Sequence, residues 1–135
     1  MKKYIKALML IFIIAIALNA KVHAQAAWRL SQSKGNVDFY YSISTCNADT
    51  VVLLKFVNKN SVSVKVGWKE VFETQYGKGM AGYSGAKQMT IAPGVTEETN
   101  CLSASKPDCI IRSDEVHPAY IARIRNFSFA EITVN

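Results

Sequence analysis

Residues 51–58 read Val-Val-Leu-Leu-Lys-Phe-Val-Asn and residues 62–72 read Val-Ser-Val-Lys-Val-Gly-Trp-Lys-Glu-Val-Phe, separated by the polar Lys59-Asn60-Ser61. The later segment alternates apolar residues with polar or small ones up to Trp68. Because strand side chains point to two faces in turn, this pattern predicts a strand with one buried and one exposed face. The earlier segment is apolar at both parities, which indicates a central strand covered on both sides. Joined by the short polar turn, the two segments predict a β-hairpin in the middle of a β core.

The rest of the chain supplies further short strands and no sustained helical period. Strands are expected at residues 37–44, 87–91 and 109–112, and residues 120–129 and 131–134 are expected to form one long strand or two broken ones. Turns or loops are expected at 45–49, 92–94, 95–108 and 114–118, and a flexible glycine-rich stretch at 74–87. Ala122 and Ile124 are out of phase with Phe127 and Phe129, which predicts a bulge near Asn126. We therefore expect an all-β protein, a small antiparallel β-sandwich of about six to seven strands, immunoglobulin-like or similar.

The first 24 residues have the features of a secretory signal peptide. A basic start, Met-Lys-Lys-Tyr-Ile-Lys, precedes an unbroken apolar run at 7–18 and the small-residue site Val22-His23-Ala24. The run has 12 residues, fewer than the roughly 20 that a spanning helix needs, so no permanent membrane anchor is expected after cleavage. The predicted organisation is a signal peptide at 1–24, an N-terminal arm at 25–36 and a single β-sandwich domain at 37–135. The predicted location is secreted, or periplasmic and cell envelope.

The basic charge of the whole chain comes mainly from this leader. The chain has 16 Lys plus Arg against 10 Asp plus Glu, a net charge of +6. Cleavage after Ala24 removes four lysines and no acid, which leaves 12 against 10, or +2. A surface this close to neutral does not predict nucleic-acid binding.

Three cysteines remain in the exported chain: Cys46, Cys101 and Cys109. Disulfides persist outside the cytoplasm, and an odd number leaves one thiol over or one bridge to a second chain. Cys101 with Cys109 is the favoured pair, because a short loop costs less entropy to close. Pairing of Cys46 with either of them stays open.

Strings that resemble catalytic or cofactor motifs lack their required context. Residues 77–82 match G-x-G-x-x-G, but no helical pattern follows them to receive a pyrophosphate. Residues 82–86 nearly match the G-x-S-x-G elbow, which belongs to parallel α/β sheets. His117 with Asp114 or Glu115 could serve a small hydrolase, although one histidine in an acidic loop is more often a surface residue. No cofactor, metal site or catalytic set is expected, and the protein is predicted not to be an enzyme.

Aromatic residues in the glycine-rich stretch are the best candidates for binding. Tyr76, Met80 and Tyr83 lie among glycines, and aromatic side chains on loops held by a rigid sandwich often contact partners. They could instead fold back and cap the end of the sandwich. Trp28 is a further candidate, either for binding or for packing on the fold. The expected function is binding of a protein or glycan at the cell surface or envelope. The alternatives are an accessory protein linked through an unpaired cysteine and the hydrolase with His117.

One family resemblance accompanies these patterns. The run Leu54 to Asn60, the strand Val62 to Trp68, the segment Ile91-Ala92-Pro93-Gly94 and Cys101 resemble uncharacterised small secreted β-domain proteins of Bacteroidota-type bacteria. Trp68, on the third expected strand, also resembles the core tryptophan of immunoglobulin-like domains, but no cysteine pair brackets it at the usual separation. These resemblances imply export and a β fold, and they carry over no activity and no residue role.

Overall fold

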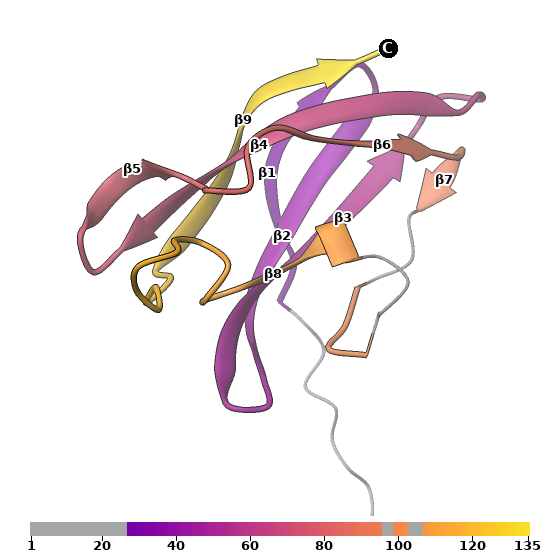
Figure 1. Cartoon of the computed structure of the whole chain (residues 1–135). Coiled ribbons are helices and arrows are strands. Elements are labelled where there is room, and N and C mark those ends of the chain that lie inside the picture. The colour runs from indigo at the N-terminus through magenta and orange to yellow at the C-terminus, as the bar shows by residue number, and fades with distance from the viewer. Residues whose placement is uncertain (1–26, 96–98, 103–106) are drawn as a thin grey trace, which may run out of the picture.

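The computed structural model describes residues 27–95, 99–102 and 107–135; the expected signal peptide lies outside them. In these residues nine strands, one only two residues long, form two antiparallel sheets that face each other (Figure 1). The strands are β1 (Arg29–Lys34), β2 (Val37–Cys46), β3 (Asp49–Asn58), β4 (Val64–Thr74), β5 (Gly77–Ala81), β6 (Lys87–Ile91), β7 (Gly94–Val95), β8 (Ile110–Arg112) and β9 (Asn126–Val134), with a 3-10 turn η1 (Pro107–Cys109) before β8. The predicted all-β sandwich is confirmed.

The first sheet is built on the long hairpin of β2 and β3. Its register runs without interruption from Val37 opposite Asn58 to Cys46 opposite Asp49. At its tip, Asn47 and Ala48 both have positive φ, the geometry of the tight turns that suit twisted hairpins. β1 adds to the outer edge of β2, whereas β7 and β8 pair with β3. Residues 45, 46 and 49, expected in a turn, are therefore strand.

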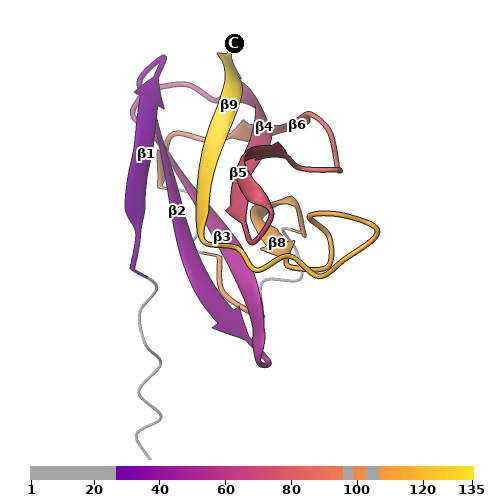
Figure 2. The same cartoon turned by 90° about the vertical axis from the view of Figure 1, so that its left-hand side faces the viewer.

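β4 is the centre of the second sheet. β9 lies along one edge of β4, and the registers of β5 and β6 place them in succession along the other edge. β1, at the edge of the first sheet, reaches across to β9: Gln32 Nε2 donates a hydrogen bond to the Phe129 carbonyl at 3.0 Å, and Lys34 Nζ donates to the Ile132 carbonyl. Side-chain hydrogen bonds thus connect the two sheets where β1 lies next to β9. Figure 2 shows these two strands.

The predicted hairpin of residues 51–58 and 62–72 is wrong, because β3 and β4 belong to different sheets. Asn58, almost fully buried, anchors the chain where it crosses over. Its side-chain amide donates to the carbonyls of Val62 at 2.8 Å and Ile91 at 3.0 Å, while its Oδ1 accepts from the Asn60 backbone amide at 3.0 Å. These bonds satisfy backbone groups that would otherwise lack partners at the crossing. The polar connection turns the chain into the opposite sheet instead of folding it back.

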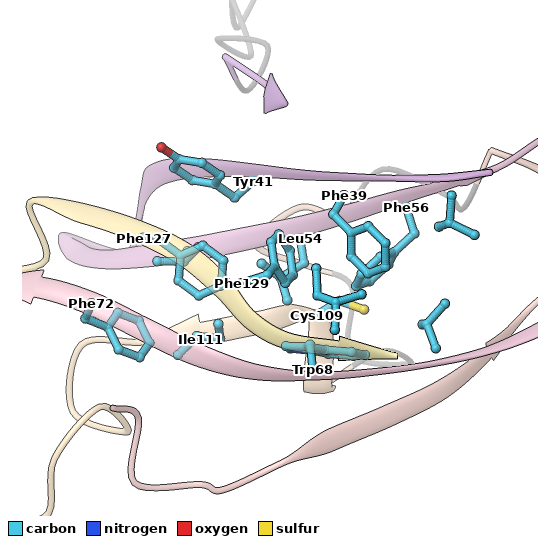
Figure 3. Close-up of a cluster of buried hydrophobic side chains, with 14 of the residues drawn as sticks. Phe39, Tyr41, Leu54, Phe56, Trp68, Phe72, Cys109, Ile111, Phe127 and Phe129 are labelled. Carbon is cyan, nitrogen blue, oxygen red and sulfur yellow. The ribbon is translucent and has the colours of Figure 1, made fainter. Parts of the chain in front are cut away.

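Aromatic rings fill the space between the sheets (Figure 3). Trp68 of β4 lies with its ring centre 5.1 Å from that of Phe56 of β3 and 6.4 Å from that of Phe129 of β9. Phe39 of β2 meets Phe56 edge to face at 5.4 Å. Val64 and Val66 point into the core on the same face of β4 as Trp68, as the alternation predicts. Val62 precedes the strand and is exposed. Fully burying one such side chain contributes about 1.5–3 kcal/mol, so this cluster is the main source of stability.

A second, smaller core lies on the outer face of the first sheet. Val51 and Leu53 of β3 pack there with Ile110, and Trp28 and Cys101 cover them. Because the alternate residues of β3 point into the main core, this strand is covered on both sides, as its sequence predicts.

Several expected boundaries need correction. The expected arm at 25–36 contains β1, and the stretch at 74–87 contains β5. Residues 121–125 form no regular strand. The bulge of β9 lies at Glu131, with φ of 47°, and not near Asn126. An extra residue at Glu131 returns Ile132 to the buried face after Phe129, which explains the change of parity along β9.

The favoured Cys101–Cys109 pairing is also wrong. Cys46 at the end of β2 is bonded to Cys101, with the two Cα atoms 5.5 Å apart, while Cys109 lies fully buried with its Sγ 3.9 Å from Met89 Sδ. Packing of residues 99–102 on the outer face of the first sheet brings the two sulfurs together. A disulfide of this kind indicates an oxidising, extracytoplasmic compartment. The described residues form no helix that is long and apolar enough to cross a membrane.

Candidate functional site

The β4–β5 hairpin and the connection from β8 to β9 lie side by side at one end of the molecule (Figure 1). Tyr76 at the hairpin tip meets Tyr120 of the connection edge to face, with ring centres 4.5 Å apart. His117 stacks on Tyr120 with ring centres 4.3 Å apart and planes 17° from parallel. Residues far apart in sequence thus form one continuous row of rings.

Hydrogen bonds hold the β4–β5 hairpin and the β8–β9 connection together next to these rings. Gln75 Nε2 donates to the Ile121 carbonyl at 3.1 Å, and Gln75 Oε1 accepts from the Arg123 backbone amide at 2.7 Å. The Tyr83 backbone amide donates to the Val116 carbonyl at 3.3 Å, which fixes residues 82–86, the loop between β5 and β6, to the same connection. The rings are therefore carried on backbone that is tied to the sheet.

Exposure separates the binding candidates from one another. Tyr76, Tyr83 and Ile121 are 66%, 73% and 69% exposed, and they make up half of the large apolar residues that are exposed in the described chain. Met80 instead folds back: its Sδ accepts from Thr74 Oγ1 at 3.2 Å and lies 3.9 Å from Tyr120 Oη. Met80 thus packs against Thr74 and Tyr120 and is not one of the exposed candidates. We call the surface formed by Tyr76, Tyr83, His117, Tyr120 and Ile121 the aromatic end.

Trp28 belongs to a different part of the fold. It is half-buried in the second core, and the Lys55 ammonium lies 5.2 Å from the centre of its ring. The same ammonium is 5.4 Å from the Tyr40 ring, so Lys55 lies between two aromatic side chains. Of the two possibilities raised by the sequence, the structure supports packing for Trp28.

The glycine-rich loop is anchored by a buried ion pair. Glu70 of β4 is 2% exposed, and its carboxylate lies 3.1 Å from Lys87 Nζ and accepts a hydrogen bond from Ser84 Oγ at 3.1 Å. A Cβ at Gly82 would lie 3.0 Å from this carboxylate and 3.0 Å from the Phe72 ring, so a larger residue there would have to displace one of these side chains. Residues 77–82 and 82–86, which resemble cofactor and nucleophile motifs, thus form the edge strand β5 and the loop that follows it. This loop is held by the bond from Ser84 to Glu70.

His117 and the neighbouring acids are engaged in local bonds. His117 Nδ1 accepts from the Ala119 backbone amide at 3.1 Å, and Glu115 Oε2 accepts from the Arg112 backbone amide at 3.0 Å. Asp114 is exposed. In the part of the chain that the structure describes, these groups do not orient one another, and no group of three or more His, Cys, Asp or Glu could hold a metal ion. A hydrolase with His117 therefore gains no support from this geometry.

A shallow hollow of about 440 Å³ lies on the outer face of the second sheet. Its floor is Gly67, where a side chain would meet Thr133 Oγ1 at 2.6 Å, and its wall includes the Lys69–Glu131 ion pair at 2.7 Å. The hollow shares no lining residue with the aromatic end, and sequence reasoning gave no signal for it.

Comparisons of the chain with protein-family models, with curated proteins and with solved structures each found no match.

Proposed function

We propose that this protein is an exported, non-enzymatic binding protein of the cell surface or envelope, and that the aromatic end contacts a protein or glycan partner. The observation that carries the proposal is that three side chains, all more than half exposed, come from backbone next to the stacked pair of Tyr120 and His117. Tyr76 meets the Tyr120 ring, Ile121 follows Tyr120 in the chain, and the Tyr83 backbone amide is bonded to Val116, which precedes His117. The signal-peptide pattern at residues 1–24 and the Cys46–Cys101 disulfide support export.

Aromatic side chains suit such a surface for physical reasons. A tyrosine has a large contact area and few rotatable bonds, so binding costs it little conformational entropy. Hydrogen bonds of Gln75 and of the Tyr83 backbone already fix the segments that carry the rings, which lowers the ordering cost further. Exposed apolar residues gathered at one place mark interaction sites more often than scattered ones do.

The test compares the double variant Tyr76→Ala/Tyr83→Ala with the exported wild type in pull-downs of envelope proteins and on glycan arrays. Loss of two central tyrosines should weaken binding by roughly 30-fold or more. A matched control is Leu30→Ala/Val62→Ala, which removes two exposed apolar side chains from other parts of the surface. Unchanged binding by the tyrosine variant in both assays would remove the aromatic end as the contact site.

A further inference from the structure

The segment that follows Ile121 presents an alternating row of side chains beside the aromatic end. Ile121, Arg123 and Arg125 are exposed, whereas Ala122 and Ile124 between them are buried in the main core. In extended backbone, residues two positions apart lie up to about 7 Å apart. One apolar residue and two guanidinium groups therefore follow one another along the surface.

Backbone hydrogen bonds fix this row next to the rings. The Arg123 amide donates to Gln75 Oε1 at 2.7 Å, and Gln75 adjoins Tyr76 in the chain. The Arg125 amide donates to the Glu73 carbonyl at 2.7 Å. The two arginines thus extend the aromatic end along the last residues of β4.

Neither guanidinium forms an ion pair with any carboxylate of the described residues. The acids nearby have other contacts: Glu73 lies 3.9 Å from Lys78 Nζ, and Glu115 accepts from a backbone amide. Asp114 is exposed, but it lies at the β8 end of the connection, next to Glu115. Within the described ranges, positive charge without a carboxylate partner is therefore concentrated at the end of the connection that leads into β9.

We propose that the partner of the aromatic end is a protein whose contacting segment carries carboxylates, and this inference rests on the proposed function. Tyrosine and arginine are the residues enriched in the hot spots of protein interfaces, and planar guanidinium groups bind carboxylates through two hydrogen bonds. Alternate carboxylates on an extended peptide are also about 7 Å apart, which matches Arg123 and Arg125.

Two observations favour a polypeptide over a sugar chain. His117 covers one face of Tyr120, so this ring does not offer both faces for stacking. Ile121, 69% exposed, provides aliphatic surface without the flat ring on which a sugar would stack. A surface of tyrosine, isoleucine and arginine instead suits a peptide segment in which an apolar side chain is flanked by charged ones.

The experiment measures binding of three probes by biolayer interferometry: a Glu-Tyr random copolymer, polygalacturonate and polylysine. We expect the wild type to bind the Glu-Tyr copolymer most tightly, with an affinity that falls as salt rises. Arg123→Gln/Arg125→Gln should weaken this binding by about tenfold. The control Arg29→Gln/Lys65→Gln removes the same charge from exposed positions elsewhere and should change it by less than about twofold.

The outcomes separate this inference from the proposed function. If the tyrosine double variant loses binding but the arginine variant does not, the inference is overturned and the aromatic end remains a binding site. Tighter binding of polygalacturonate than of the copolymer, equal losses in the arginine variant and its control, or no copolymer binding up to about 1 mM each overturn the acidic polypeptide as partner. If neither double variant changes any binding, both proposals fail.

Discussion

Replacing Cys46 and Cys101 by alanine removes a covalent link between residues 55 positions apart. In the chain-entropy treatment, a closed loop of that length restricts the unfolded chain by about 4 kcal/mol, whereas the roughly eight-residue loop of a Cys101–Cys109 bond would give about 2.5 kcal/mol. The bond also holds residues 99–102 over the second core, where Thr99 Oγ1 donates to the Leu54 carbonyl at 2.6 Å. We expect the double variant to lose about 3–4 kcal/mol of unfolding free energy.

Urea unfolding followed by tryptophan fluorescence and by circular dichroism measures this loss, since Trp68 is buried and Trp28 half-buried. Cys109→Ala is the matched control, because it removes a buried sulfur without opening a loop and should cost about 1 kcal/mol. Peptide mapping of the oxidised protein identifies the bonded pair directly. A loss no larger than that of the control, or a mapped Cys101–Cys109 bond, would refute the reasoning.

Two further substitutions test the turns and the charges. Ala48→Gly should raise the unfolding free energy by about 1 kcal/mol, because Ala48 has φ of 73° in the β2–β3 turn, where a Cβ is strained; a melting temperature that stays the same or falls would contradict this. At acid pH the test residue is Asp38: hydrogen bonds from Lys59 first and then from Ser33 hold its pKa below the usual 3.8. Because the folded-state pKa is the lower one, the stability from this carboxylate is complete above about pH 4 and is lost as pH falls through the folded pKa. Asp38→Asn should therefore be less stable at neutral pH and lose less stability on acidification; pH-dependent unfolding curves parallel to the wild type would sink this account.

The strands with a continuous apolar pattern can be predicted from the sequence. The alternation of residues 64–68 and the two-sided pattern of 51–57 correctly predicted one strand with a single buried face and one covered on both faces. Sequence reasoning missed β1, because Arg29–Lys34 is almost entirely polar and exposed and is held by pairing with β2 rather than by burial. It also missed β5, since a glycine-rich strand at a sheet edge has no apolar period to detect.

The candidate site was found only in part for a related reason. Tyr76 and Tyr83 stand out in the sequence because they lie among glycines, and both are exposed. Tyr120, Ile121 and Arg123 come from a segment about 45 residues later, and no local pattern indicated that they would lie beside Tyr76. Gln75, whose amide bonds both Ile121 and Arg123, makes that connection, and a lone glutamine carries no such signal in a sequence.

By itself the sequence determined the β character of the chain, the faces of its central strands and the expectation of export, because alternation and composition act over a few neighbouring residues. The tertiary structure alone decided that β3 and β4 enter different sheets, that Cys46 rather than Cys109 bonds Cys101, and that Tyr76 meets Tyr120. Each of these depends on which distant segments become neighbours. That choice follows from packing the whole core at once, and a polar turn, a cysteine or an exposed ring is compatible with several partners until the packing selects one.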